Sequence, residues 1–316
     1  MTVIAESGFA RAVIAGLSQT PKVIPARFFY DRRGSELFEE ITRLPEYYPT
    51  RTEIGLLERH GPDIARLVGR GRVVVEFGSG SSTKTPLLLA QVDPAAYVPV
   101  DISADFLRDS AAALAQAHPG LDVLPVAADF THPFALPARV AGRPMLGFFP
   151  GSTIGNMNHA HAVDLLRAFR DTLGEAARLV IGIDTRKNPR LLEAAYDDAA
   201  GVTAAFNLNL LHRINRELGG SVPVEAFEHR AIWNDTLGRI EMHLLATRPV
   251  EFVVAGRRFG LAAGETIHTE NSYKYTAPEA RFLARASGWE PLAAWTDSRE
   301  LFSLHVWAAA PARMEP

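Results

Sequence analysis

The amino-acid sequence predicts an α/β fold, built on a parallel, doubly wound sheet and joined to a second, smaller α+β domain. Two observations carry this prediction. Within residues 72–184, short β-branched runs alternate with stretches of helical periodicity, as in sheets whose strands are linked by helical crossovers. Within residues 231–261, apolar and polar residues alternate with a period of two, which is typical of antiparallel strands with one solvated face.

In the first half of the α/β region, each expected strand is followed by a turn and a helix. The run from Arg72 to Phe77 is β-branched and ends at a glycine turn, and a helical pattern starts at Lys84. Asp101 and Asp129 stand at the ends of the next two apolar runs. Parallel strands end at the same edge of a sheet, so we expect these carboxylates at one crevice. The expected strands are 72–77, 97–102 and 123–130, and the expected helices are 84–91 and 104–117.

The second half of the α/β region continues the same alternation. An apolar run begins at Met145, and Asn158 is a suitable N-cap for a helix that reaches about Leu173. A strand-like run follows at 177–184. Near the C-terminus we expect a helix at 278–286 and an antiparallel strand pair, around Trp295 and at 301–308, that completes the first sheet.

After Asp184 the pattern changes. Pro189 is expected to open one long helix that reaches about Leu218, because proline at the first helical position sacrifices no internal hydrogen bond. Three runs with period-two alternation then predict one antiparallel meander. These runs are 231–235, 239–248 and 251–261.

The N-terminal segment carries its own helix signal. Thr50 to Glu53, directly before Ile54, fits a capping box that opens a helix, and the preceding EYYP at 46–49 is expected to be a loop. The change of pattern then divides the chain into two discontinuous domains. We expect one domain at 52–186 and 275–316, and a second at 1–51 and 187–274.

Composition excludes several classes of protein. The chain has 316 residues, 47% hydrophobic and 22% charged, which is typical of a globular protein. The net charge of -3 and the lack of a basic stripe argue against nucleic-acid binding, so we expect a small-molecule partner. The absence of cysteine excludes disulfides and zinc-thiolate sites. No run is apolar enough for a membrane span or a secretory signal, and we expect a cytoplasmic monomer.

The turn after the first strand suggests a site for a nucleotide-like ligand. Gly78 and Gly80 allow the backbone to pass close beneath a ligand, and the amides at the next helix start favour polar or anionic groups. A dinucleotide fingerprint requires a third glycine where this chain has Thr83, which disfavours NAD. A nucleotide-binding oxidoreductase therefore stays open as an alternative of a different class.

The acidic residue before this turn favours another reading. Glu76-x-Gly78-x-Gly80 resembles motif I of Rossmann-like class I methyltransferases, although Ser82 replaces that motif's usual third glycine. The resemblance implies S-adenosylmethionine as cofactor, with the turn beneath its methionine part. Asp101 would accept hydrogen bonds from the ribose hydroxyls, and Asp129 and Phe130 would lie at the adenine. Lys84 would pair with the cofactor carboxylate.

Five further stretches, in the same order along nearly the whole chain, carry a more specific resemblance. The sequence resembles the histidine Nα-methyltransferases of ergothioneine biosynthesis. That resemblance implies three successive methyl transfers to the α-amino group of L-histidine, giving hercynine. It also implies that the second domain binds the substrate. We expect no metal, because the chain has no cysteine and no set of ligands at zinc-type spacing. The stretches are LPEYYPTRTE (44–53), GSTIGN (151–156), YDDAAGVTAAFN (196–207), RIEM (239–242) and TENS (269–272).

The resemblance also implies roles for individual side chains. Tyr47, Asn156 and Tyr196 would hold the α-carboxylate and α-amine, and Tyr47 and Asn156 are therefore the expected catalytic residues. Phenols and a carboxamide bind these groups without adding positive charge. The Gly151 carbonyl would help to orient the amine. The imidazole subsite and its wall would be formed by Glu270, Ser272 and Met242.

Alternatives remain open at these positions. Taken singly, Tyr47 in the EYYP run, Asn156 after a glycine and a core Met242 are ordinary structural residues. Another free amino acid, including one that bears an indole, is the nearest alternative acceptor, and a catalytically silent amino-acid binder is a third reading. His159 and His161 have no third ligand at zinc-type spacing, so we expect both to be exposed residues at a helix start.

Overall fold

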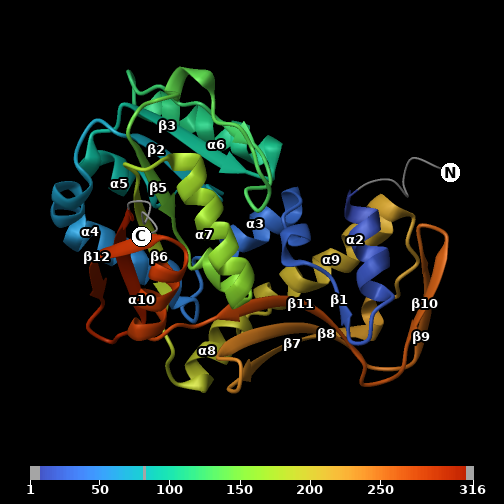
Figure 1. Cartoon of the computed structure of the whole chain (residues 1–316). Helices are drawn as coiled ribbons and strands as arrows, with labels where there is room; N and C mark the ends of the chain where they lie inside the picture. The colour runs from blue at the N-terminus through green and yellow to red at the C-terminus, as the bar shows by residue number, and fades with distance from the viewer. Residues whose placement is uncertain (1–7, 81–82, 311–316) are drawn as a thin grey trace, which may run out of the picture. The chain divides into compact units, whose positions relative to one another are not determined.

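The computed structural model describes residues 8–80 and 83–310, so Ser82 lies outside the described residues. The chain divides into two compact units (Figure 1). Unit 1 comprises Met1–Tyr47 and Lys187–Ser272, and unit 2 comprises Tyr48–Arg186 and Tyr273–Pro316. Each unit is thus assembled from segments that are distant in the sequence.

Unit 2 is built on a seven-stranded sheet with the strand order β12-β13-β6-β5-β2-β3-β4. The five strands from β6 to β4 are mutually parallel, and β13 runs antiparallel to both of its neighbours, β6 and β12, as in a doubly wound α/β sheet with one antiparallel strand near its edge. The predicted fold class is therefore confirmed. The strands are β2 (Val73–Phe77), β3 (Ala96–Asp101), β4 (Val126–Ala127), β5 (Met145–Phe149), β6 (Arg178–Asp184), β12 (Trp289–Thr296) and β13 (Phe302–Ala309).

Helices cover both faces of this sheet. Val74 on β2 packs into a core with Leu57 of one helix and Leu88 of another, whereas Val73 and Val75 belong to a second core on the opposite face. Because the central strands are buried on both faces, their sequences are continuous apolar runs. The helical segments are α4 (Tyr48–Val68), α5 (Thr85–Val92), α6 (Ala104–Ala117), η2 (Ala138–Val140), η3 (Thr153–Asn156), α7 (His159–Leu173) and α10 (Ala277–Ala286).

Two expectations for unit 2 are wrong in detail. The expected strand 123–130 is reduced to the two residues of β4 and a bridge at Val123, because Pro125 between them has no amide hydrogen to donate. The expected capping box does not open α4, because the helix begins at Tyr48, two residues before Thr50. The second half of the expected loop 46–49 is therefore helical. Proline is tolerated in a first helical turn, and Thr52 donates to the Tyr48 carbonyl from inside the helix.

Unit 1 packs helices against a four-stranded sheet of order β1-β11-β8-β7. A separate hairpin of β9 and β10 extends from it. The strands are β1 (Lys22–Val23), β7 (Phe227–Asn234), β8 (Arg239–Ala246), β9 (Val250–Val254), β10 (Arg257–Leu261) and β11 (Thr266–Tyr273). The helical segments are α2 (Gly8–Leu17), η1 (Ala26–Phe29), α3 (Arg32–Ile41), α8 (Pro189–Tyr196), α9 (Val202–Leu218) and η4 (Val224–Ala226).

Unit 1 also corrects two expectations. The helix that begins at Pro189 ends at Tyr196, and a new helix begins at Val202. Gly201 has a φ of 74°, and the Asp198 carboxylate accepts hydrogen bonds from the amides of Val202 and Thr203, so it caps the second helix. The expected single meander is likewise wrong, because 251–261 forms the hairpin β9–β10 and β8 pairs with β11.

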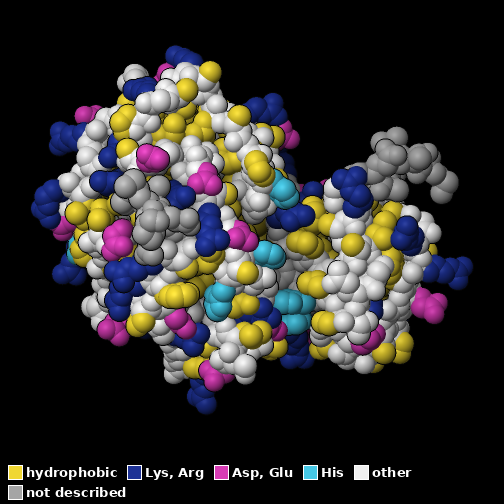
Figure 2. All heavy atoms as spheres, viewed as in Figure 1, with side chains coloured by type: hydrophobic (Ala, Val, Ile, Leu, Met, Phe, Trp, Pro, Cys, Tyr) yellow, Lys and Arg dark blue, Asp and Glu magenta, His cyan; other side chains and the backbone are white. Residues whose placement is uncertain are grey.

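Surface charge agrees with the composition. On the face shown in Figure 2, basic and acidic side chains of the described residues are interspersed and form no continuous basic stripe. Within residues 8–80 and 83–310, no helix combines the length and apolar character that a membrane span requires.

Candidate functional site

The glycine turn after β2 is a compact loop at the carboxyl edge of the unit 2 sheet. Gly78 and Gly80 have φ values of 76° and 49°, which lie in the left-handed region. A Cβ on Gly78 would stand 3.3 Å from the ring of Phe130. The turn and Phe130, which were both predicted to contact one ligand, are therefore neighbours.

Asp101 closes β3 beside this turn. Its Oδ2 accepts a hydrogen bond from the Gly80 amide at 3.0 Å, and its Oδ1 accepts one from the Ser103 amide at 2.9 Å. Each carboxylate oxygen has two lone pairs, so each retains capacity for a further donor. Asp101 is partly exposed. The structure thus presents an oriented carboxylate that can bind two hydroxyl groups.

Asp129 and Phe130 follow β4. Oδ1 of Asp129 accepts from the amide of Thr131 at 3.0 Å and from its hydroxyl at 2.5 Å, so this carboxylate stabilises its own loop. The ring of Phe130 packs edge-on against Phe149 at 5.7 Å and Phe77 at 6.4 Å. Phe130 is anchored in the core while one side lies against the glycine turn.

Glu76 has a different environment from the one expected of a ligand-binding residue. Its side chain is buried, and its Oε2 accepts hydrogen bonds at 2.6 Å from the hydroxyls of Thr85 and Tyr97. Burial raises the pKa of Glu76 to about 7, although these two hydrogen bonds oppose the shift. Glu76 joins the start of α5 to β2 and β3, and so supports the turn from within the protein.

This burial predicts a pH effect on stability. The ordinary pKa of 4.5 is raised in the folded state, so the native protein keeps a proton that the unfolded chain loses. The resulting stabilisation is complete below about pH 4.5 and declines as pH rises through 7. Between pH 5 and pH 8 we expect Glu76 to account for a decline of about 2 to 3 kcal/mol in the free energy of unfolding.

Urea denaturation of the wild type and of Glu76→Gln at both pH values tests this effect. Glutamine offers Thr85 and Tyr97 an acceptor oxygen but does not titrate. The difference in unfolding free energy between the two proteins should therefore shift by about 2 to 3 kcal/mol in favour of the variant at pH 8. A difference that stays constant with pH would show that Glu76 does not titrate in this range.

Lys84 is paired with a residue that the sequence analysis placed elsewhere. Its Nζ lies 2.5 Å from Oε2 of Glu53, which also accepts from the Gly151 amide at 2.9 Å. Glu53 is completely buried, and Gly182 leaves room for its carboxylate, since a Cβ there would lie 2.0 Å from Oε1. One carboxylate thus connects two candidate site residues.

Glu53 was missed because it was assigned to a capping box. A signal was present in the sequence: Glu53 precedes Leu56 and Leu57 at helical spacing, and all three are buried on one face of α4. A charge on the apolar stripe of a helix requires a partner, because an unpaired buried charge is costly. The partners were not visible, since Lys84 and Gly151 are distant in the sequence.

The loop after β5 carries Gly151 and Asn156 in a restrained conformation. Gly151 and Ser152 have φ values of 77° and 56°, and the Ser152 hydroxyl accepts from the Asp184 amide at 2.9 Å. The Thr153 hydroxyl donates to the Pro150 carbonyl at 2.9 Å. These bonds place η3, at whose end Asn156 lies partly exposed.

Three of the predicted substrate residues come together within unit 1. The hydroxyls of Tyr196 on α8 and Ser272 on β11 are 2.7 Å apart. The rings of Tyr47 and Tyr196 are in edge contact, with centroids 6.2 Å apart. Met242 is buried on β8, and Glu270 is partly exposed on β11. Strand β11 therefore carries both residues predicted to bind an imidazole.

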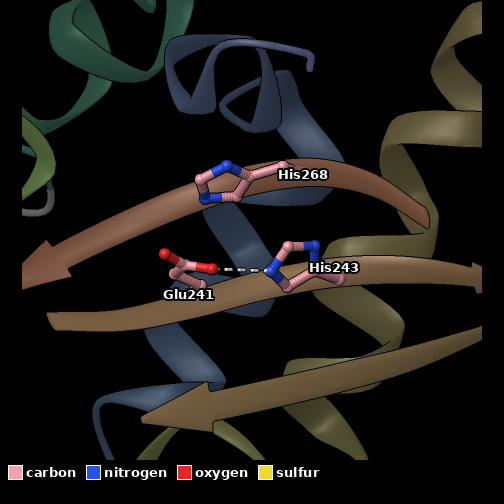
Figure 3. Close-up of side chains that lie close together, drawn as sticks. All are labelled: Glu241, His243 and His268. Carbon is pink, nitrogen blue, oxygen red and sulfur yellow. Dashed lines mark hydrogen bonds and ion pairs between the residues drawn. The ribbon is translucent and has the colours of Figure 1, made fainter. Parts of the chain in front are cut away.

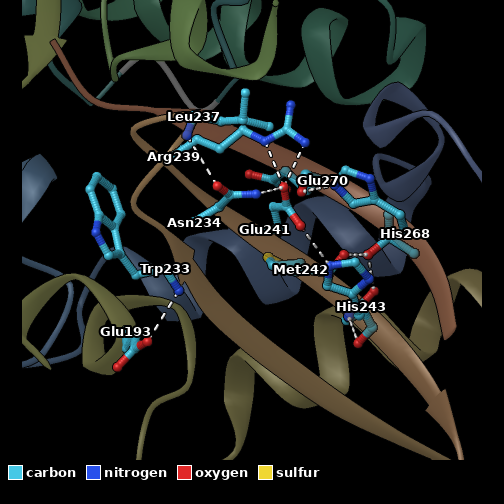
Figure 4. Close-up of polar contacts among 12 residues, drawn as sticks. Glu193, Trp233, Asn234, Leu237, Arg239, Glu241, Met242, His243, His268 and Glu270 are labelled. Carbon is cyan, nitrogen blue, oxygen red and sulfur yellow. Dashed lines mark hydrogen bonds and ion pairs between the residues drawn. The ribbon is translucent and has the colours of Figure 1, made fainter. Parts of the chain in front are cut away.

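A carboxylate–imidazole cluster on the unit 1 sheet was not anticipated from the sequence (Figure 3). Glu241, His243 and His268 place one ligand atom each within 4.8 Å of one another. Oε2 of Glu241 accepts from Nε2 of His243 at 3.1 Å, while Oε1 accepts from Nε and Nη2 of Arg239 at 2.8 and 2.5 Å. Figure 4 shows the wider network, in which Asn234 also donates to Glu241.

The geometry of this cluster is that of an ion-pair network and not of a cation site. The rings of His243 and His268 are stacked, with centroids 4.7 Å and planes 19° apart, so their in-plane lone pairs do not converge. Nε2 of His268 donates to the Glu270 carbonyl at 2.9 Å. Burial would raise the pKa of Glu241, but the hydrogen bonds from Arg239 and His243 outweigh it and lower the value.

His159 and His161, which the sequence analysis set aside as metal ligands, are exposed at the start of α7 as expected. Asn158 caps this helix, as predicted, by accepting from the His161 amide at 2.9 Å. The His159 ring lies 4.8 Å from the ring of Tyr273.

Comparison with known proteins assigns the chain to a family. Residues 9–309 match a family described as histidine-specific methyltransferase, SAM-dependent. A histidine N-alpha-methyltransferase of Mycolicibacterium smegmatis is 40% identical over 96% of this chain and 95% of that protein, and one of Mycobacterium tuberculosis is 38% identical over 94% of each. Ergothioneine biosynthesis protein 1 of Neurospora crassa is 30% identical over 91% of this chain and 33% of the fungal protein. The chain therefore belongs to the family of S-adenosylmethionine-dependent, histidine-specific methyltransferases.

Proposed function

We propose that this protein transfers methyl groups from S-adenosylmethionine to the α-amino nitrogen of L-histidine, in three rounds that give hercynine for ergothioneine biosynthesis. The observation that carries the proposal is the match of residues 9–309 to a histidine-specific methyltransferase family. The bacterial relatives bear the name histidine N-alpha-methyltransferase, and the fungal relative is named for ergothioneine biosynthesis. We further expect a monomer that acts in the cytoplasm.

The edge of the unit 2 sheet fits the cofactor. S-adenosylmethionine supplies an electrophilic methyl group on a sulfonium, together with a ribose and an adenine. The free lone pairs of the Asp101 carboxylate suit the two ribose hydroxyls, and the glycine turn permits close approach of the ligand. Phe130 presents an aromatic ring beside that turn, and Asp129 lies next to it for contact with the adenine.

The cofactor's carboxylate is assigned to Lys84. Its ammonium already pairs with Glu53, and an ammonium has three donor hydrogens, so it can serve a second carboxylate. Glu76 acts indirectly in this scheme, by holding Thr85 at the start of α5. Residues 52–186 and 275–316 would thus form the cofactor domain, and residues 1–51 and 187–274 the substrate domain.

The substrate is assigned mainly to unit 1. The phenols of Tyr47 and Tyr196 are donors for the α-carboxylate, and the Asn156 carboxamide and the Gly151 carbonyl orient the α-amine. Glu270 and Ser272 would bind the imidazole, with Met242 as part of the wall. A carboxylate can accept an imidazole N–H, whereas an apolar ring would leave it poorly paired, which favours histidine over other amino acids.

The residues act by positioning the amine for in-line displacement. Holding the nitrogen at near-attack distance supplies much of the rate enhancement, and no covalent intermediate with the protein is required. An α-amine with a pKa of about 8 is partly neutral at physiological pH. Asn156 directs its lone pair, and Tyr47 holds the adjacent carboxylate. In each round the N–C bond forms as the C–S bond breaks, which releases S-adenosylhomocysteine. The ammonium gives up one proton to water before each attack, and the third transfer leaves a trimethylammonium that carries no N–H.

A survey of acceptors tests the proposal. Purified protein is incubated with S-adenosylmethionine and each common amino acid separately, and products are identified by mass spectrometry. We expect histidine alone to gain up to three methyl groups, with release of S-adenosylhomocysteine. Preferred methylation of tryptophan would overturn the assigned acceptor, and it is the informative comparison because a 25% identical relative is named 4-dimethylallyltryptophan N-methyltransferase. Absence of any methylated amino acid would overturn the activity itself.

A further inference from the structure

We propose that His229 and Asn207 are positioning residues that fix the geometry of the amino-acid subsite. This inference rests on the proposed function, and it concerns two buried polar residues to which that function assigns no role. Asn207 closes the YDDAAGVTAAFN stretch and is 0% exposed, while His229 is 8% exposed on β7. Buried polar groups of this kind are retained when their hydrogen bonds specify one arrangement.

The carboxamide of Asn207 joins α9 to three strands of the unit 1 sheet. Its Nδ2 donates to Nδ1 of His229 at 2.8 Å and to the His243 carbonyl at 3.1 Å. Its Oδ1 accepts from the Thr269 hydroxyl at 2.9 Å. Both hydrogens and the oxygen of the carboxamide are therefore engaged, with partners on β7, β8 and β11.

His229 transmits this anchoring to the end of α8. Its Nε2 lies 2.8 Å from the main-chain oxygen of Tyr196. A carbonyl only accepts, so Nε2 carries the hydrogen and Nδ1 is free to accept from Asn207. Burial lowers the pKa of His229, which is consistent with this neutral tautomer. The imidazole thus satisfies one of the last carbonyls of α8, at the helix break that follows Tyr196.

The bonds form a continuous path between two parts of the assigned substrate subsite. One end is the backbone of Tyr196, and the other is Thr269 on the strand that carries Glu270 and Ser272. The Thr269 hydroxyl also lies 3.1 Å from the main-chain oxygen of Met242. The path therefore holds α8 and β11 at the separation at which the Tyr196 and Ser272 hydroxyls meet at 2.7 Å.

Positioning through this path has a kinetic consequence. Neither side chain is assigned to substrate or cofactor. Their loss would free α8 and β11 from this anchoring and so weaken binding of the amino acid. It would leave cofactor binding intact, because the cofactor residues belong to unit 2. A catalytic subsite displaced by a fraction of an ångström loses both affinity and alignment. The expected signature is a higher KM for histidine with an unchanged Kd for S-adenosylhomocysteine.

Three variants test the path, with KM, kcat, the Kd of S-adenosylhomocysteine by calorimetry and Tm measured for each. His229→Leu removes both hydrogen bonds and should raise the KM for histidine about tenfold or more. His229→Gln keeps a donor for the Tyr196 carbonyl and should return KM to within about threefold of wild type. Thr269→Val, which retains the volume of the side chain, should raise KM about three- to tenfold. The Kd should stay within about twofold throughout.

Thr247→Val is the matched control, because the Thr247 hydroxyl donates to the Ala226 carbonyl in the same unit and lies outside the path. It should leave KM unchanged. An unchanged KM in His229→Leu would overturn the proposal. If His229→Leu fails to fold, an unchanged KM in Thr269→Val would overturn it instead. A rise in KM that comes with an equal rise in the Kd of S-adenosylhomocysteine and with a fall in Tm would also overturn it. If the wild type prefers another acceptor, the histidine assignment fails, and the KM for that amino acid tests the path instead.

Discussion

Lys274→Met is expected to lower the free energy of unfolding by about 3 to 5 kcal/mol, because it leaves a buried carboxylate without its counter-ion. Nζ of Lys274 lies 2.7 Å from Oδ2 of Asp184, and their side chains are 0% and 1% exposed. The hydroxyl of Tyr48 lies 2.9 and 2.8 Å from the two oxygens of the same carboxylate. A neutral hydroxyl does not replace the lost charge.

The position of this ion pair adds to its importance. Tyr48, Asp184 and Lys274 each lie within three residues of a boundary at which the chain passes from one unit to the other. Arg186, at one of these boundaries, also donates from Nε to the Lys274 carbonyl at 3.3 Å. One buried cluster thus joins the residues of unit 2 that lie next to the three boundaries.

Urea denaturation, monitored by circular dichroism, measures the loss in the free energy of unfolding. Lys274→Met combined with Asp184→Asn removes both charges and should recover part of the loss. Arg285→Met is the control, since its partner Glu290 and Arg285 itself are 52% and 64% exposed, and such pairs contribute about 1 kcal/mol at most. A loss below about 1 kcal/mol in Lys274→Met would contradict the prediction.

Asp101→Ala is expected to weaken binding of S-adenosylhomocysteine by about 2 to 4 kcal/mol, which corresponds to roughly 30- to 1000-fold in Kd. The substitution removes the carboxylate proposed to bind both ribose hydroxyls. It also releases the amides of Gly80 and Ser103, which Asp101 now holds at 3.0 and 2.9 Å. Both changes weaken the binding of the cofactor. Asp101 does not contact histidine in the proposed scheme, so binding of histidine should not change.

Isothermal titration calorimetry with S-adenosylhomocysteine provides the measurement. Asp105→Ala is the matched control, because this acidic residue stands at the next helix start, is 77% exposed and pairs with Arg108. We expect its Kd to stay within about twofold of wild type. If Asp101→Ala also binds within about threefold of wild type while remaining folded, Asp101 does not bind the ribose.

Local sequence patterns determined much of the architecture of unit 2. The helix at 104–117 agrees with α6 at both ends, and the Asn158 cap of α7 is present as predicted. Central parallel strands are buried on both faces, so their apolar runs stand out from the amphipathic helices between them. The position of Asp101 and Phe130 beside the glycine turn also follows from pattern, because parallel strands bring their carboxyl ends to one edge of a sheet.

Long-range contacts decided what local patterns did not. Helical periodicity runs through 189–218, but Asp198 and Gly201 form a cap that divides the segment. Glu53 fits a capping box by spacing, yet its partners Lys84 and Gly151 lie 31 and 98 residues away. A carboxylate has the same local signature in either role, so only tertiary packing distinguishes them.

The sequence by itself determined the α/β fold class, the glycine turn and, through whole-chain resemblance, the family. Tertiary structure alone decided which polar groups meet, as with Tyr196 and Ser272 at a separation of 76 residues, or Asn207 with Thr269 at 62. The physical reason is the range of the interactions. Backbone propensity and hydrophobic periodicity act over neighbouring residues, whereas a hydrogen bond between distant side chains exists only after the chain has packed.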